Sequence, residues 1–212
     1  MPDVHTYVLF VAAALALLLV PGPAVVYVIA RSVSGGRLTG LVSVLGIELG
    51  TLTHVVFAAA GLSAIVASSV VAFSVVKWLG AAYLVYLGLR QIFGRGSGEQ
   101  EAPSPGSNDG RFRVFYQSVL VQVLNPKVAL FFLAFLPQFV DPSNGAAWTQ
   151  IVVLGATLAF LGLFTDGLYA LLGGTAGSWI RTKDLGLRQA GRYVTGGIYV
   201  ALGAVAAISG KD

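Results

Sequence analysis

Two proline-containing triplets interrupt long apolar runs of this chain: Pro21-Gly22-Pro23 and Asn125-Pro126-Lys127. A proline inside a helix removes a backbone hydrogen bond and clashes with the carbonyl four residues earlier. The carbonyl groups that are freed here belong to Leu17, Leu19 and Gln122. In apolar surroundings they need a protein group, water or a ligand. Interrupted apolar segments at matching places in two halves of a chain are typical of a transporter binding site.

Each triplet also resembles the start of a new helix. Gly22 can act as an N-cap before Pro23, and Asn125 as a stronger N-cap before Pro126,. Two helix starts would then offer N–H groups and partial positive charge inside the membrane, which suits a carboxylate. A plain proline kink is the alternative interpretation of each triplet.

Four ionisable residues fall within the apolar runs, where charged groups are costly and usually functional: Glu48, His54, Lys127 and Asp166,. Glu48 and Asp166 can bind an ammonium group or carry a proton. An ion pair between Lys127 and one acid, serving only to hold helices together, is the alternative. For His54 a structural hydrogen bond is favoured over a proton relay. Tyr169 follows Asp166 by one turn and either shares its face or packs against neighbours,.

These groups are expected at similar depths. At about 1.5 Å per residue from the cytoplasmic helix ends, the two breaks, Glu48 and Asp166 all lie within about 12 to 20 Å, and His54 at about 24 Å. Gly46 and Gly50 flank Glu48. Their spacing indicates that this helix can approach a neighbour closely at the level of Glu48.

The composition indicates an integral membrane protein. Of the 212 residues, 56% are hydrophobic and 10% are charged, and the mean hydropathy is +0.82. A soluble domain has about 25% charged residues. The net charge of +4 does not indicate nucleic-acid binding, because the basic residues flank apolar runs rather than forming a patch. Cysteine is absent, which excludes disulfides and thiolate chemistry.

The apolar runs predict an all-α protein with six transmembrane helices in a 3+3 inverted repeat, the first and fourth helices being broken. Residues 1–93 form the first three-helix repeat, 94–111 a flexible cytoplasmic linker rich in Gly, Ser and Pro, and 112–212 the second repeat,. Within one membrane domain, the expected helices are 4–33, 38–66, 70–93, 112–140, 146–174 and 191–209.

The basic residues predict the orientation of these helices. Ten of the 13 Lys and Arg residues fall on one side of a six-helix arrangement. The positive-inside rule makes that side cytoplasmic, so both termini are expected on the outer, periplasmic side.

At these residues the chain resembles the LysE/RhtB family of amino-acid exporters. The resemblance rests on the PGP stretch with its basic turn, on KWLGAAYLVYLGLR, on NPK followed by FLPQFV, and on DGLYALLGG. It implies a six-helix carrier of the bacterial inner membrane that exports amino acids with an ion gradient, and it places Pro21 to Pro23 and Asn125 to Lys127 at the family's motif positions. Glu48 departs from the family pattern, where this position is often small or apolar, and this indicates substrate tuning.

The sequence therefore predicts a non-enzymatic exporter of an amino acid or a small derivative by alternating access, with proton antiport and no cofactor or bound metal. The substrate carboxylate would lie at the two helix starts and its ammonium group at Glu48 or Asp166; one acid, with His54 as a further candidate, would carry the proton. The alternatives are an intramembrane enzyme, against which neither HExxH nor GxSxG occurs,, and a metal exporter. A homo-oligomer is left open.

Overall fold

The computed structural model describes residues 2–68 and 110–176, together with seven separate positions between 71 and 89. All of the described regular structure is helical. Most of the predicted third helix and linker, and all of the predicted sixth helix, lie outside the described residues. The six-helix inverted repeat and the division at 94–111 therefore remain predictions.

The first break falls where the sequence predicts it. Helix α1, Val4–Leu19, is capped by Asp3, whose carboxylate accepts a hydrogen bond from the Thr6 N–H at 3.0 Å. The chain resumes helical structure at Pro23, the first residue of α2. The Gly22 carbonyl accepts the first helical bond from the Val26 N–H at 3.0 Å. Gly22 therefore occupies the N-cap position, with proline directly after it.

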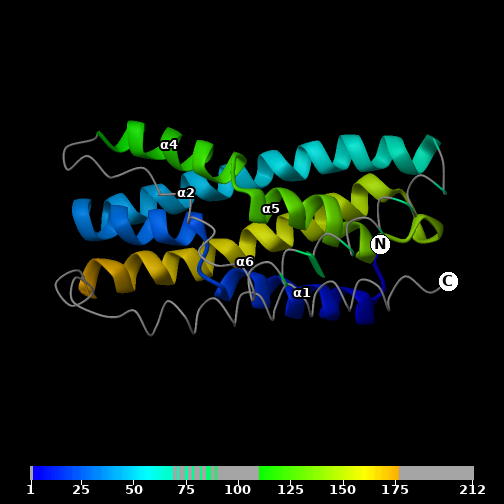
Figure 1. Cartoon of the computed structure of the whole chain (residues 1–212), viewed down its shortest axis with the longest axis horizontal. Helices are drawn as coiled ribbons and strands as arrows, with labels where there is room; N and C mark the ends of the chain where they lie inside the picture. The colour runs from blue at the N-terminus through cyan, green and yellow to red at the C-terminus, as the bar shows by residue number, and fades with distance from the viewer. Residues whose placement is uncertain are drawn as a thin grey trace.

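Helix α2, Pro23–Ser68, consists of two arms that join at Gly36, where φ is +82°. Only glycine adopts such an angle without strain. A Cβ atom on Gly40 would approach the Ser32 side chain to 2.6 Å, although a straight helix would hold these residues about 12 Å apart,. The chain therefore reverses here, and the arms correspond to the end of the predicted first helix and to the predicted second helix (Figure 1).

The second break separates α4, Arg111–Val123, from α5, Pro126–Leu130, with a bend of 44°. Asn125 caps α5, as predicted: its side-chain oxygen accepts a hydrogen bond from the Lys127 N–H at 3.1 Å. The segment continues as a π-helix, Phe131–Phe135 (η1), and a 3₁₀ helix, Leu136–Phe139 (η2). The sequence predicted only a broken α-helix here.

An aromatic cluster packs this irregular segment against α1. The ring of Phe10 lies 6.0 Å from that of Phe131 and 5.3 Å from that of Phe139, measured between centroids. Phe135 contacts both of the latter rings. All four side chains are buried in the larger of the two apolar clusters of the described chain. This packing joins the start of the first half to the end of the second broken segment.

After a short 3₁₀ turn, Pro142–Asn144 (η3), helix α6 runs from Ala147 to Ala176 along the whole bundle. Figure 1 shows that α4 and α5 run opposite to α1 and the first arm of α2. The two broken segments are thus antiparallel, as an inverted repeat requires.

Glycines let α2 lie very close to its neighbours. A Cβ atom on Gly46 would collide with the Phe115 carbonyl oxygen, and one on Gly50 would approach the Gln122 side chain on α4 to 2.6 Å. On α6, a Cβ atom at Gly155 would lie 2.5 Å from Val55. The close approach expected from the spacing of Gly46 and Gly50 is confirmed, and it brings α4 and α2 together at the level of Glu48.

The outer faces of the helices suit a bilayer. Within the described residues, apolar stretches long enough to cross a membrane fall in Pro23–Gly61, which turns back at Gly36, and in Ala147–Gly173, and the bent segment 111–139 is a third when it is taken as one span. Large apolar side chains such as Phe57, Phe160 and Phe164 are more than half exposed. Such extensive apolar exposure is expected of a surface that faces lipid.

Arg31 is one of the ten basic residues that the six-helix arrangement assigns to the cytoplasmic side, but its side chain is buried, with 2% exposed. The guanidinium group donates to the Tyr27 hydroxyl at 3.0 Å and to the Gln117 side-chain oxygen, and it lies 5.2 Å from the Tyr27 ring centroid. It therefore joins the first arm of α2 to α4 inside the bundle, because a buried charge needs such partners.

The glycine contacts can be tested with Gly46→Ala. We expect it to lower the free energy of unfolding by about 1–3 kcal/mol, because the new methyl group meets backbone atoms that must move,. Gly61→Ala on the same helix is the matched control, since no atom of the described residues lies within 4 Å of its Cβ position. Thermal unfolding of both variants in detergent measures the difference, and equal transitions would contradict the close packing of α2 on α4.

The predicted orientation can be tested by cysteine labelling, because the chain has no cysteine of its own. Ala146→Cys and Gly110→Cys place thiols at exposed positions at the two ends of the bundle. In intact cells, a membrane-impermeant maleimide should label position 146 only, and position 110 should react after the membrane is permeabilised. Labelling of position 110 but not of position 146 in intact cells would contradict the predicted orientation.

Candidate functional site

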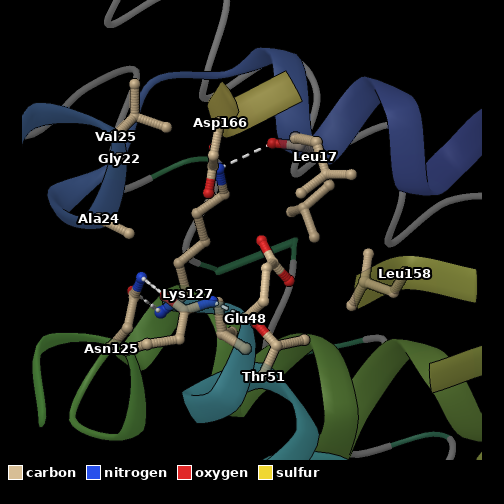
Figure 2. Close-up of a pocket in the computed structure, with 13 residues that line it drawn as sticks. Leu17, Gly22, Ala24, Val25, Glu48, Thr51, Asn125, Lys127, Leu158 and Asp166 are labelled. Carbon is tan, nitrogen blue, oxygen red and sulfur yellow. Dashed lines mark hydrogen bonds between the residues drawn. The ribbon is translucent and has the colours of Figure 1, made fainter. Parts of the chain in front are cut away.

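A pocket lies between the two helix breaks, at the centre of the bundle (Figure 2). Five of the predicted site residues line it together: Gly22, Glu48, Asn125, Lys127 and Asp166. They come from both halves of the chain. The other lining residues are Leu17, Leu18, Ala24, Val25, Thr51, Gln122, Val128 and Leu158. These residues, which the sequence places at similar depths, therefore line one cavity.

The remaining predicted residues do not line this pocket. Pro21, Pro23 and Pro126 shape the breaks, and His54 and Tyr169 contact the breaks from neighbouring helices.

Lys127 bridges the two breaks. Its ammonium group donates hydrogen bonds of 2.7 Å to the carbonyl oxygens of Leu17 and Val20, at the end of α1 (Figure 2). Gly22 leaves room for this side chain, since a Cβ atom there would lie 3.2 Å from the lysine Cδ atom. A positive charge at a helix C-terminus also interacts favourably with the helix dipole. The lysine of the second break thus stabilises the first.

Two further side chains bind carbonyls freed by the prolines. The Tyr169 hydroxyl donates to the Leu19 carbonyl at 3.0 Å. The imidazole Nε2 of His54 lies 3.2 Å from the Gln122 carbonyl oxygen, and its ring stacks on Phe132. The structural hydrogen bond favoured for His54 is therefore present. Each break is bound by side chains from the other half of the chain.

The two carboxylates lie close enough to interact within the pocket. Glu48 and Asp166 are 9% and 4% exposed, and they repel each other electrostatically. Asp166 also interacts with the Lys127 ammonium group, which it faces in Figure 2. Asp166 is therefore the acid that faces Lys127, and an ion pair between the two remains a prediction. Buried carboxylates are strong acceptors for a cationic ligand.

The two helix starts differ in how open they are. At α5 the Asn125 side chain occupies the Lys127 N–H. At α2 the N-cap is Gly22, which has no side chain to offer, and the first-turn residues Ala24 and Val25 line the pocket. The sequence predicts an anion site at both helix starts, and the first start is the more accessible of the two.

Sequence reasoning missed two polar residues of the pocket. The Gln122 amide donates to the Thr51 hydroxyl at 2.8 Å, and its oxygen accepts from the Asn125 amide at 3.2 Å. This chain of bonds joins α2 to the second break. Gln122 is an isolated amide in an apolar stretch, and that isolation is the signal that identifies it.

The pocket is small in this conformation. Its volume is about 40 Å³, which leaves room for about three waters. Among the described residues, no group of three or more His, Asp or Glu side chains is placed to hold a metal ion.

Comparison with known proteins identifies the family. The family model described as LysE type translocator matches residues 15–210, almost the whole chain. The protein belongs to the LysE type translocator family. The resemblance seen in the PGP and NPK motifs is thereby confirmed, and the chain is an integral membrane protein of a transport family.

Individual relatives agree with this assignment. The translocator is 31% identical to an uncharacterized membrane protein of Vibrio cholerae over 187 residues, covering 88% of this chain and 90% of the relative. It is 30% identical to a homoserine/homoserine lactone efflux protein of Salmonella typhi, covering 78% and 79%. An uncharacterized membrane protein of Bacillus subtilis is 28% identical, covering 94% and 97%. No solved structure matches the translocator.

The hydrogen bond across the first break can be tested with Tyr169→Phe. In this translocator the change should lower the free energy of unfolding by about 1 kcal/mol, because the Leu19 carbonyl loses its donor,. Tyr116→Phe is the control, since Tyr116 is exposed on α4 and contacts its neighbours through its ring. Thermal unfolding compares the two, and equal effects would contradict a role for the Tyr169 hydroxyl.

Proposed function

We propose that this translocator exports an amino acid or small derivative, of the homoserine or homoserine lactone type, across the bacterial inner membrane in exchange for protons. The observation that carries the proposal is the pocket between the breaks. Its lining includes a buried carboxylate from each half of the chain and the open helix start of α2. The family match and the efflux relatives support export of an amino compound.

The pocket contains groups suited to both ends of an amino acid. The carboxylates of Glu48 and Asp166 can accept hydrogen bonds from a substrate ammonium group. The first turn of α2, at Ala24 and Val25, presents backbone N–H groups and the positive end of the helix dipole to a substrate carboxylate or ester carbonyl,. Leu17, Leu158 and Val128 provide apolar walls for a short side chain.

Alternating access requires the hydrogen bonds between the halves to change. Space for about three waters is too little for an amino acid, so the conformation described here has to open around its substrate. The bonds that Lys127, Tyr169 and His54 make to the opposite break are suited to hold this closed conformation. Opening would expose the pocket first to the cytoplasm and then to the outside.

The substrate proposal is tested by uptake into inside-out membrane vesicles containing the full-length protein. We expect radiolabelled homoserine or its lactone to accumulate when the vesicle interior is acidified, and the accumulation to collapse when an ionophore removes the pH gradient. Glu48→Gln and Asp166→Asn should each weaken transport by about tenfold or more, because each removes a charge-assisted hydrogen bond of about 2 kcal/mol.

Vesicles with Tyr116→Phe protein provide the control for expression and insertion, because this exposed residue lies outside the pocket. Wild-type transport by both carboxylate variants would contradict the acid-based mechanism. Purified protein that converts a peptide or lipid without any gradient would favour the intramembrane enzyme instead.

A further inference from the structure

The proposed exchange involves one of two acids, and the structure distinguishes them. Among the described lining residues, the ionisable side chains are Glu48, Lys127 and Asp166, two acids and one base. A lysine ammonium group has three donors. Two of them bind the carbonyls of Leu17 and Val20, and Asp166 interacts with the same charge. In the part of the chain that the structure describes, the Lys127 ammonium group therefore interacts with these two carbonyls and with the charge of Asp166.

Glu48 lies apart from this arrangement. In Figure 2 the lysine side chain extends towards Leu17 and Asp166, while the Glu48 carboxyl group lies in the middle of the pocket. The groups that act on it electrostatically or by hydrogen bonding are Asp166, which repels it, and the Thr51 hydroxyl. When both acids are ionised, Glu48 is the acid that Lys127 does not compensate, among the described residues that line the pocket. A buried carboxylate of this kind requires either a proton or a cationic ligand.

Gly162 on α6 creates the space for this carboxyl group. A Cβ atom at position 162 would lie 2.5 Å from the Glu48 Oε1 atom and 3.0 Å from its Cδ atom. Real Cβ atoms essentially never come as close as 2.5 Å to another heavy atom, so the flexible carboxyl end of Glu48 would have to shift,. Any larger residue at 162 would push the carboxyl group away from its present place. The position of Glu48 therefore depends on a glycine from the other half of the chain.

We propose that Glu48 is the exchange site of this translocator, where the substrate ammonium group and a proton compete, and that Gly162 is the positioning residue that seats it. Asp166 instead compensates Lys127, and so maintains the first break. This inference rests on the proposed function and assigns the exchange to one of its two acids.

The exchange balances in protons and keeps the Glu48 charge neutralised, and with a zwitterionic amino acid it moves one net positive charge inward. With the pocket open to the cytoplasm, Glu48 releases its proton there and binds the substrate ammonium group as a carboxylate. With the pocket open to the outside, the substrate leaves and Glu48 takes up an external proton. One positive group moves out and one proton moves in. Within the part of the chain that the structure describes, the other ionisable groups of the pocket are Asp166 on α6 and Lys127 on α5, and α1 and α4 contribute Leu17, Leu18 and Gln122.

Competition predicts a specific pH dependence in proteoliposomes with equal pH on both sides. For the wild type, KM for the substrate should rise as pH falls, by up to about tenfold per pH unit, with kcat little changed. Glu48→Gln should raise KM, remove its pH dependence and abolish accumulation driven by a pH gradient. Asp166→Asn should reduce the rate and stability of the protein but keep the pH dependence of KM.

The role of Gly162 is tested with Gly162→Ala, which should raise KM by about tenfold, comparable to losing one good contact. Gly167→Ala on the same helix is the matched control, because its Cβ position has no neighbour within 4 Å in the described part of the chain. The double variant Gly162→Ala/Glu48→Asp should recover part of the lost affinity, since the shorter side chain avoids the new methyl group. A merely structural glycine would show no such rescue.

The outcomes distinguish a failure of this inference from a failure of the proposed export function. If wild-type protein transports no amino compound, both fail. If the wild type transports but Glu48→Gln retains the pH dependence, or Asp166→Asn loses it, the assignment to Glu48 is overturned alone. Equal effects of Gly162→Ala and Gly167→Ala, or the absence of rescue by Glu48→Asp, overturn the positioning role of Gly162. Size-exclusion chromatography of each variant confirms that it is folded.

Discussion

The structure depends on one requirement: backbone carbonyls that lose their helical partners inside an apolar bundle must find other donors. Pro21, Pro23 and Pro126 create this requirement at two places. The freed carbonyls at 17, 19 and 122 are each bound by a side chain from a different helix. These bonds hold the breaks open as helix ends and keep the chain from continuing as simple kinked helices.

The arrangement of charge follows from the same requirement. Lys127 has to reach the end of α1, and its ammonium group draws Asp166 into the same region. Glu48 approaches from α2, which can come close because Gly46 and Gly50 remove side chains from its contact with α4. The ionisable groups of the pocket are thus placed partly by backbone chemistry and partly by small-residue packing, before any ligand is considered.

Much of the site could be predicted because it rests on local rules. Gly22 and Asn125 could be recognised as helix starts from proline geometry and capping preference, and helix length placed Glu48 and Asp166 at the same level. The hydrogen bonds of Lys127 to Leu17 and Val20 could not be predicted, because the partners of such a flexible side chain are determined only by the packed structure. Gly162 escaped notice for the same reason, since its role depends on a residue 114 positions earlier. The π-helix 131–135 likewise reflects tertiary packing of phenylalanine rings rather than a local sequence rule,.

The donors that bind the carbonyls of the first break come from the second half of the chain, and this has a consequence for biosynthesis. A ribosome makes Leu17, Leu19 and Val20 long before Lys127 and Tyr169. The nascent first half therefore enters the membrane without the donors that complete its break in the finished protein. Until they arrive, water or the insertion machinery has to solvate those carbonyls. The native break is completed only after the second half has been inserted, so assembly of the first half has to wait for its partner.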